Sequence, residues 1–373
     1  MKRHSLQIRL AGALIALLLP TAPLHAHETR IETVVEGLDR PWSLAFLPDG
    51  DMLVTERSGQ LRRIEADGTL VRDPVKGLPE DIYVDGQGGL MDVVLDPAFE
   101  ENRRIFISYS CGTRKANHTC LGRAVLGENA LEEFREIFRA QPAKQGSAHY
   151  GGRIAFLPDR TLLLTIGDGF DYREKAQNKS DHLGSIVRLD RDGQAPDDNP
   201  FLGEPAARKE LYSIGHRNPQ GLLHDPASGR VYSHEHGPRG GDEINVIEAG
   251  NNYGWPVITY GVDYNGAQIS PLTEKEGMEQ PIVVWTPSIA PSGMTLYDGD
   301  LFPDWQGDLF SGALAKRKVQ RVMLEGGEVQ GEEALFEDLN RRIRDVRTGP
   351  DGALYLLTDH GNGELLRVVP KDH

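Results

Sequence analysis

Two short segments of the chain carry side chains that could move a proton. His149 opens the string His149-Tyr-Gly-Gly-Arg153, directly before an apolar run, and Asp168 follows the next apolar run. A histidine at such a boundary can act as a general base because its reference pKa lies near neutrality. A carboxylate can hydrogen-bond the imidazole and fix its tautomer. A lone histidine can equally be structural, and Gly-Asp-Gly can simply be a turn.

Other polar segments carry groups that suit an anionic ligand. Arg217 and Asn218 stand together, and their donors fit carboxylates and carbonyls. Residues 316–318 read Lys-Arg-Lys, and Arg342 and Arg344 would share one face of a strand. The chain has a formal net charge of -15, so converging cations indicate an anionic ligand. A solvated basic rim would have the same composition.

The segment from residue 234 to residue 256 has the composition of a calcium site. His234 and His236 stand two residues apart, which is not the helical HExxH spacing of zinc enzymes, and no cysteine is near. Carboxylates beside a bent Gly237-Pro238 backbone instead suit calcium, which accepts carbonyl and carboxylate oxygens together.

A repeated phrase predicts the elements that position these segments. An apolar alternation leads through a turn, usually marked by Pro and Asp, to a second apolar run, and this occurs six times. The first runs lie at 42–50, 90–97, 153–159, 220–226, 293–297 and 346–352. The second runs lie at 52–55, 105–108, 162–165, 231–233, 308–311 and 354–358. A third short strand is expected at 60–64, 185–189, 243–247, 319–322 and 364–368.

Period-two alternation buries one face of each strand. Sets of strands recurring at about 50 to 60 residues predict an all-β, six-bladed propeller, as a single domain over residues 27–373. A β-sandwich is the alternative, but it has no reason to repeat one turn phrase at this period. Only residues 128–139 have a helix-like pattern, and a strand and turn would also fit them.

The first 26 residues have the pattern of a signal peptide. Lys2, Arg3 and Arg9 accompany an apolar run at 10–19, and Ala26 offers a small residue for cleavage. A membrane anchor is the alternative, but the run is short for a bilayer. We therefore expect a periplasmic or secreted protein without a membrane span. Its acidic surface would repel nucleic acid and anionic lipid.

The chain has two cysteines, Cys111 and Cys120, which flank a polar loop. Export to an oxidising compartment predicts a local disulfide between them. A redox-active pair is the alternative, but the spacing is not CxxC.

Taken together and in this order, the segments resemble the glucose/sorbosone dehydrogenase family, and within it the bacterial aldose sugar dehydrogenases that use pyrroloquinoline quinone (PQQ). The resemblance runs from Glu32 to Val369. The strings that carry it are DGQGGL (85–90), HYGGR (149–153), GHRNPQG (215–221), EHGP (235–238), NYGWP (252–256) and RIRD (342–345).

The resemblance implies a sugar dehydrogenase that passes hydride from the anomeric carbon to PQQ, and then electrons to an external acceptor. It assigns His149 as the base, Asp168 as its orienting partner and Arg217 as a further catalytic group. It also assigns residues that hold the cofactor, with Tyr264 on a loop over the site. These are Gln87, Arg217, Asn218, Tyr264, Lys316, Arg342 and Arg344.

The resemblance further implies two calcium ions. The carbonyls of Gly237 and Pro238 would bind one beside the quinone, and Glu243 with the carbonyl of Tyr253 would bind a structural one. The chain lacks the long insertions of the larger glucose dehydrogenases of the family, which by analogy favours a monomer with an open site and a broad sugar range.

Two other functions fit a six-bladed propeller. A calcium-dependent lactone hydrolase would need calcium in the central channel, held mainly by side-chain carboxylates and asparagine. A non-catalytic binding propeller would leave the combination of His149, Arg217 and Arg344 without a purpose. No GxGxxG string opens a helix, so nothing favours a nicotinamide cofactor.

Overall fold

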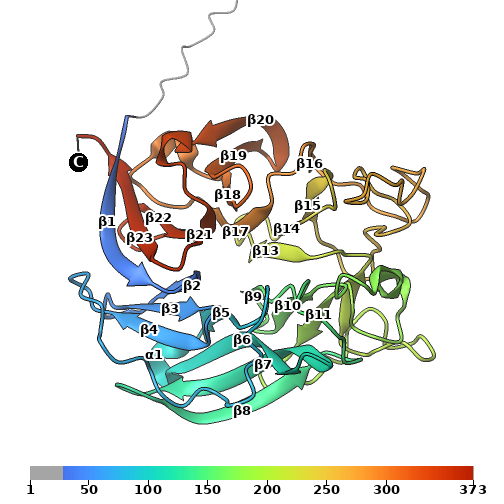
Figure 1. Cartoon of the computed structure of the whole chain (residues 1–373), viewed down its shortest axis with the longest axis horizontal. Coiled ribbons are helices and arrows are strands. Elements are labelled where there is room, and N and C mark those ends of the chain that lie inside the picture. Colours follow the sequence, from blue (N-terminus) through green and yellow to red (C-terminus); the bar gives the residue numbers. More distant parts are fainter. Residues whose placement is uncertain (1–27, 373) are drawn as a thin grey trace, which may run out of the picture.

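The computed structural model describes residues 28–372, which form six antiparallel sheets arranged as the blades of a propeller (Figure 1). Six innermost strands contact one another in a closed ring around the axis. These are β2 (Pro41–Phe46), β5 (Leu90–Leu95), β9 (Ile154–Phe156), β13 (Pro219–His224), β17 (Pro291–Leu296) and β21 (Ile343–Thr348).

Each innermost strand pairs with the strand that follows it, as the repeated phrase predicts. The second strands are β3 (Met52–Glu56), β6 (Arg104–Thr113), β10 (Leu162–Ile166), β14 (Val231–Glu235), β18 (Leu309–Ala313) and β22 (Leu354–Thr358). The third strands are β4 (Gln60–Ile64), β7 (Ala116–Leu126), β11 (Ser185–Leu189), β15 (Asp242–Val246), β19 (Lys318–Glu325) and β23 (Gly363–Pro370). The prediction of a six-bladed propeller is confirmed.

Outer strands complete five of the six blades. They are β8 (Leu131–Arg139), β12 (Leu211–Ile214), β16 (Val283–Trp285), β20 (Glu328–Leu335) and β1 (Thr29–Leu38). Strand β1 pairs with β23, so segments from the two ends of the chain share the last blade (Figure 1). This pairing closes the ring between the first and last repeats.

The helix-like reading of residues 128–139 is wrong, and the alternative of a strand is right. Leu131, Phe134 and Ile137 are spaced as on a helix, but they belong to β8, which pairs with β7. The register shifts twice along this pair, which lets a strand carry a pattern that is not strictly alternating. Helical segments among residues 28–372 are short: α1 (Phe99–Asn102), η1 (Arg173–Gln177), η2 (Pro303–Trp305) and η3 (Glu337–Leu339).

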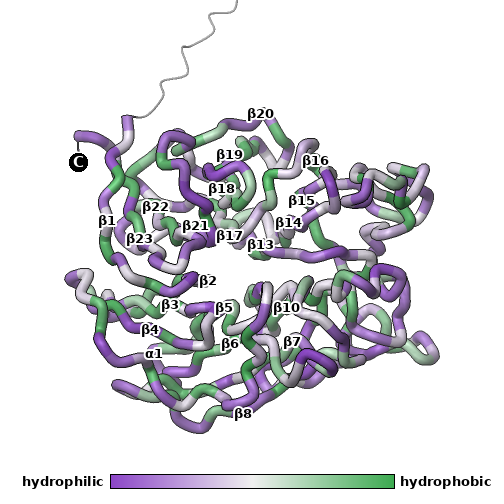
Figure 2. Tube along the Cα trace, viewed as in Figure 1, coloured by the Kyte–Doolittle hydropathy of each residue, from purple (hydrophilic) through white to green (hydrophobic). Residues whose placement is uncertain are grey.

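Apolar side chains hold the blades together. One buried cluster lies at each of the six boundaries between neighbouring blades. Hydrophobic segments accordingly follow the strands, whereas many connecting loops are hydrophilic (Figure 2). Cys111 on β6 and Cys120 on β7 form the predicted disulfide, with their Cα atoms 6.0 Å apart. Within residues 28–372 no helix is long and apolar enough to cross a membrane. The predicted signal peptide lies outside the described residues.

Four charged side chains meet where the innermost strands face the axis. The Nη1 atom of Arg153, directly before β9, lies 3.1 Å from Asp345 on β21 and 3.5 Å from Asp92 on β5. Arg347 on β21 contacts the same carboxylates at 2.9 and 3.2 Å. Asp345 also accepts a hydrogen bond from the backbone of Leu44 on β2. These contacts therefore join blades that are far apart in the sequence.

We expect Asp345→Ala to lower the free energy of unfolding by about 3–5 kcal/mol, because it leaves arginine charge buried without its partner. Chemical denaturation followed by tryptophan fluorescence measures the loss. Asp67→Ala is the matched control, since Asp67 is exposed and bonds only within its own turn. Equal effects of the two substitutions would contradict a structural role for the axial charges.

Candidate active site

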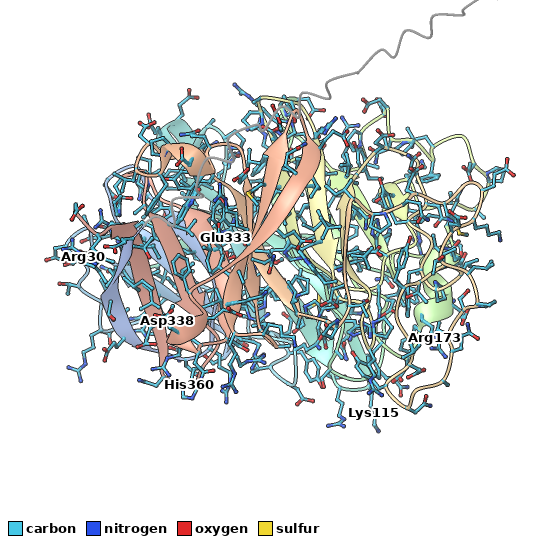
Figure 3. All side chains as sticks on the ribbon, turned by 90° about the horizontal axis from the view of Figure 1, so that it is seen from above. Arg30, Lys115, Arg173, Glu333, Asp338 and His360 are labelled. Atoms are coloured by element: carbon cyan, nitrogen blue, oxygen red, sulfur yellow. A yellow bond between two sulfur atoms is a disulfide. The ribbon has the colours of Figure 1, made fainter. Side chains whose placement is uncertain are left out.

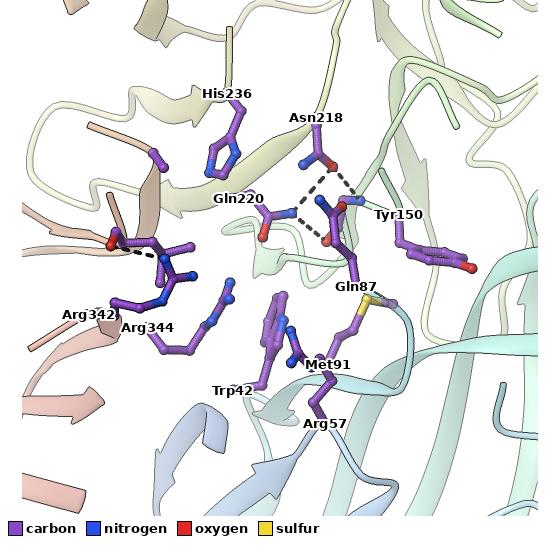
Figure 4. Close-up of a pocket in the computed structure, with 13 residues that line it drawn as sticks. Trp42, Arg57, Gln87, Met91, Tyr150, Asn218, Gln220, His236, Arg342 and Arg344 are labelled. Atoms are coloured by element: carbon purple, nitrogen blue, oxygen red, sulfur yellow. Dashed lines mark hydrogen bonds between the residues drawn. The ribbon is translucent and has the colours of Figure 1, made fainter. Parts of the chain in front are cut away.

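A cavity lies at the axis, at the end of the ring where the innermost strands begin (Figure 4). Every blade contributes to its wall. The lining residues are Trp42, Arg57, Gln87, Met91, Tyr150, Gly151, Asn218, Gln220, His236, Ala290, Leu314, Arg342 and Arg344. Most come from the start of an innermost strand, and Arg57, His236 and Leu314 each directly follow the second strand of their repeat.

The cavity has an aromatic wall supported by the axial charges. Trp42, Met91 and Tyr150 pack together as a separate buried cluster. The guanidinium carbon of Arg153 lies 3.9 Å from the centre of the Trp42 ring, in cation–π contact. The indole is therefore held rigidly, and such a flat face can stack on a planar ligand.

Opposite sides of the cavity differ in charge. Arg57, Arg342 and Arg344 gather on one side, and the amides of Gln87, Asn218 and Gln220 lie on the other (Figure 4). A planar ligand between them would meet cations at one edge and neutral hydrogen-bonding groups at the other.

The arginine side carries more positive charge than its partners neutralise. Arg342 and Arg344 both contact Asp359, at 2.8 and 3.3 Å, and they hold the pKa of Asp359 at about 2 although burial acts to raise it. The Nε of Arg344 is buried and has no hydrogen-bond partner among residues 28–372. Burial lowers the pKa of both Arg57 and Arg344. An anionic ligand would give Arg344 Nε a hydrogen-bond partner and would balance the buried charge of Arg57 and Arg344. These residues therefore fit the predicted cofactor.

His149 and Asp168 form a buried pair. The Nδ1 atom of His149 lies 2.7 Å from Oδ1 of Asp168, and both side chains are almost fully buried. Asp168 also accepts hydrogen bonds from the indole of Trp255 and the backbone of Phe170, each at 2.8 Å. The backbone N–H of His149 donates to Gln87 at 2.7 Å. With Nδ1–H directed at the carboxylate, Nε2 is left as the acceptor.

Electrostatics keeps this pair as a neutral imidazole and a carboxylate. Burial lowers the pKa of His149, which outweighs the raising effect of the hydrogen bond to Asp168. Burial acts to raise the pKa of Asp168, but the hydrogen bond from His149 and the charge of Arg217 lower it overall. At neutral pH the ring can therefore accept a proton, as a general base must.

Arg217 lies beside a second cavity, and its neighbour Asn218 lines the axial one. Arg217 lines the second cavity, and its Nη1 donates to the carbonyls of His236 at 2.9 Å and Gly237 at 2.7 Å. Its Nη2 donates to the hydroxyl of Tyr264 at 3.2 Å. The half-exposed ring of Tyr264 stacks on Phe170, which packs edge-on against His149. The second cavity therefore borders the proposed base.

The Gly237-Pro238 segment offers oxygen ligands of the kind that calcium prefers. Its carbonyl at Gly237 already faces a cation, the Arg217 guanidinium. The N–H of Gly237 donates to Asp242 at 2.8 Å, which fixes the loop. Pro238 lines the second cavity. The donor chemistry fits calcium, which would share the Gly237 carbonyl with Arg217 or replace it there.

The second calcium site has partial support. Glu243 on β15 pairs in register with Glu235 on β14 and forms no ion pair within residues 28–372. Burial and the charge of Glu235 raise the pKa of Glu243 to about 8. Asn245 donates to Glu243 at 3.0 Å, and its own buried Oδ1 has no partner among the described residues. A hard cation would suit these oxygens. The role of the Tyr253 carbonyl as a calcium ligand stays a prediction.

The structure brings most predicted site residues together, but not Lys316. That side chain is exposed and outside the cavity lining, where Leu314 stands instead. Sequence reasoning assigned no role to Trp42, Arg57 or Gln220. A positional rule would have found two of them, because Trp42 lies at the start of an innermost strand and Arg57 directly follows a second strand.

Fold and site together define a propeller enzyme with a buried histidine–carboxylate pair beside a cation-rich cavity. The family model described as glucose/sorbosone dehydrogenase matches residues 38–367, and the chain belongs to this family. It is therefore an oxidoreductase of a family of sugar dehydrogenases.

Relatives and solved structures agree with this assignment. The chain is 44% identical to aldose sugar dehydrogenase YliI of Escherichia coli over 92% of its length and 93% of the relative's. The crystal structure of the soluble aldose sugar dehydrogenase from Escherichia coli in the apo-form matches with a TM-score of 0.88 and 43% identity, over 92% and 100% of the two chains. The PQQ-bound aldose sugar dehydrogenase from Streptomyces coelicolor matches with a TM-score of 0.74 and 28% identity, over 92% and 99%.

We expect Asp168→Asn to lower the pKa of His149 further below its ordinary 6.5, because the substitution removes the hydrogen bond that raises it. It should also populate the tautomer with the proton on Nε2. Proton–nitrogen correlation spectra of the histidine-labelled protein report both quantities. Asp67→Asn, at an exposed position in a distant turn, is the control and should leave them unchanged.

Proposed function

We propose that this protein is a quinoprotein that oxidises aldose sugars at the anomeric carbon to lactones, with PQQ as cofactor and calcium assisting. The observation that carries the proposal is the arginine-rich axial cavity beside the buried His149–Asp168 pair. The PQQ-bound relative from Streptomyces coelicolor supports the choice of cofactor.

The cavity suits a planar cofactor with three carboxylates. Arg57, Arg342 and Arg344 would meet the carboxylates, and Gln87 and Asn218 would bond ring carbonyls or nitrogens. Trp42 would stack on one face of the ring system. Bound there, the quinone supplies the hydride acceptor, and the protein supplies binding, orientation and charge.

The proton of the sugar's anomeric hydroxyl would go to Nε2 of His149. The bond from Nδ1–H to Asp168 keeps Nε2 free to accept it and stabilises the imidazolium that forms. Trp255 and the Phe170 backbone hold Asp168 in place. Arg217 would bond developing negative charge near the reacting carbonyl and so belongs to the catalytic group.

Calcium would bind the carbonyls of Gly237 and Pro238 and contribute a fixed positive charge beside the cofactor. Glu243 and the carbonyl of Tyr253 are proposed to hold the structural calcium, with Asn245 as a further oxygen donor. Tyr264 would cover the site from its exposed loop. Lys316 could meet the cofactor only if its side chain moved from its exposed position.

The competing lactone hydrolase fits less well. The axial carboxylates of Asp92 and Asp345 are matched by Arg153 and Arg347, so they are not free to hold calcium in the channel. A non-catalytic binding propeller does not require a buried base with an orienting carboxylate such as the His149–Asp168 pair.

We also propose a periplasmic or secreted monomer that passes electrons to an external acceptor. The Cys111–Cys120 disulfide supports this location, because such bonds persist in oxidising compartments.

Reconstitution tests the cofactor assignment. We expect the purified protein, stripped with a chelator, to reduce a dye with aldoses only when PQQ and calcium are both added. Either addition alone, or NAD with calcium, is the control. Equal activity with NAD, or none with PQQ at saturating calcium, would refute the proposal.

Substitutions at two positions should separate chemistry from binding. His149→Ala should reduce kcat by about two to four orders of magnitude, the usual contribution of a positioned base, while PQQ still binds. Arg344→Met should instead weaken PQQ binding, measured by titration of fluorescence quenching, because a buried carboxylate loses its cation. Near-normal turnover of His149→Ala at saturating PQQ and sugar would show that the base lies elsewhere.

A further inference from the structure

Lys144 is a buried lysine that the proposed mechanism does not use. Its side chain is only 2% exposed, and its Nζ has no hydrogen-bond partner among residues 28–372. The ammonium lies 3.6 Å from the centre of the Tyr150 ring, in cation–π contact. Burial of an ionisable group without an ion pair is costly, which makes a role worth seeking.

The position of Lys144 relates it to both members of the buried pair. Tyr150, whose ring it contacts, follows His149 in the chain. Gly169 follows Asp168, and a Cβ atom on this glycine would lie 2.8 Å from Cδ of Lys144. Gly169 also has a φ of +77°, a conformation that favours glycine. The lysine therefore packs against both segments that carry the His149–Asp168 pair.

The backbone fixes the lysine in this place. Lys144 and Asn117 on β7 exchange two backbone hydrogen bonds of 2.9 Å. The side chain of Asn117 accepts a hydrogen bond from the Tyr150 hydroxyl at 2.9 Å. The backbone of Lys144 and the ring of Tyr150 are thus both anchored to Asn117, which fixes the two partners of the cation–π contact relative to each other.

We propose that Lys144 is a positioning residue for the base: its buried ammonium, packed against the two segments that carry the pair, disfavours retention of a proton on His149. The inference rests on the proposed role of His149 in sugar oxidation. It assigns Lys144 no contact with substrate or cofactor.

The charges around the lysine support this role. Asp168 and Asp171 are the carboxylates that act on Lys144, and its own charge acts with that of Arg217 to lower the pKa of His149. Burial lowers the pKa of Lys144 to about 7, against the raising effect of the two carboxylates. The lysine is therefore charged below pH 7, in the range where His149, with its pKa lowered from 6.5, takes up its proton.

Lys144→Met tests the proposal, because methionine keeps the length and apolar stem but removes the charge. We expect the midpoint of the acid limb of kcat/KM in the reconstituted enzyme to rise by roughly half to one pH unit, the effect of losing one nearby charge. Lys144→Arg should stay close to the wild-type midpoint. Lys115→Met is the control, since Lys115 is exposed at the tip of the adjoining hairpin and points away from the molecule (Figure 3).

A second measurement uses the protein without cofactor or calcium. The pKa of His149, followed by NMR in histidine-labelled protein and assigned with His149→Gln, should rise in Lys144→Met and not in Lys115→Met. Unchanged midpoints in both measurements, with altered thermal stability alone, would reduce Lys144 to a packing role and overturn the proposal. If His149→Ala kept full turnover, the proposed base would fail, whereas the NMR shift would still test the effect of Lys144 on the pair.

Discussion

The ion pairs of buried Arg153 and half-buried Arg347 with two buried aspartates at the axis are the contacts on which the rest of the molecule depends. Apolar contacts between blades are not directional, so they alone would let the blades slide past one another. The ion pairs that join β5, β21 and the start of β9 fix the relative positions of these strands. The same Arg153 that completes these pairs lies against Trp42. The charges that orient the blades therefore also position the aromatic wall of the axial cavity, and a shift in one would displace the other.

Closure of the ring determines where chemistry can occur. Each repeat brings residues at or just before the start of its innermost strand to the axial cavity, and three of the six also bring the residue after their second strand. Gln87, Asn218 and Arg342 occupy the first kind of position, and Arg57, His236 and Leu314 the second. All six repeats thereby contribute to one pocket. Residues separated by hundreds of positions in the chain then act together without any long insertion.

Sequence reasoning predicted the ring because alternation and turns recur locally, and it predicted the His149–Asp168 pair because both residues flank a strand. It failed where tertiary pairing overrides local pattern, as at Leu131–Arg139, whose helical spacing lies on a bulged outer strand. Trp42 carries no chemical signal by itself and gains its role only from the ring. Lys316 belongs to a run of cations, none of which lines the cavity, because the turn places Leu314 there instead.

The balance of charge in the axial pocket acts against its collapse. Arg57, Arg342 and Arg344 share the carboxylate of Asp359, and collapse of the cavity would bring the remaining positive charges closer and bury them more deeply. Their mutual repulsion therefore acts against collapse, and the aromatic wall is held by Arg153 from behind. An anion that enters the pocket removes this repulsion and stabilises the folded state by its binding free energy. The excess positive charge of the cavity thus opposes folding stability, and the same charge would be the source of affinity for an anionic ligand.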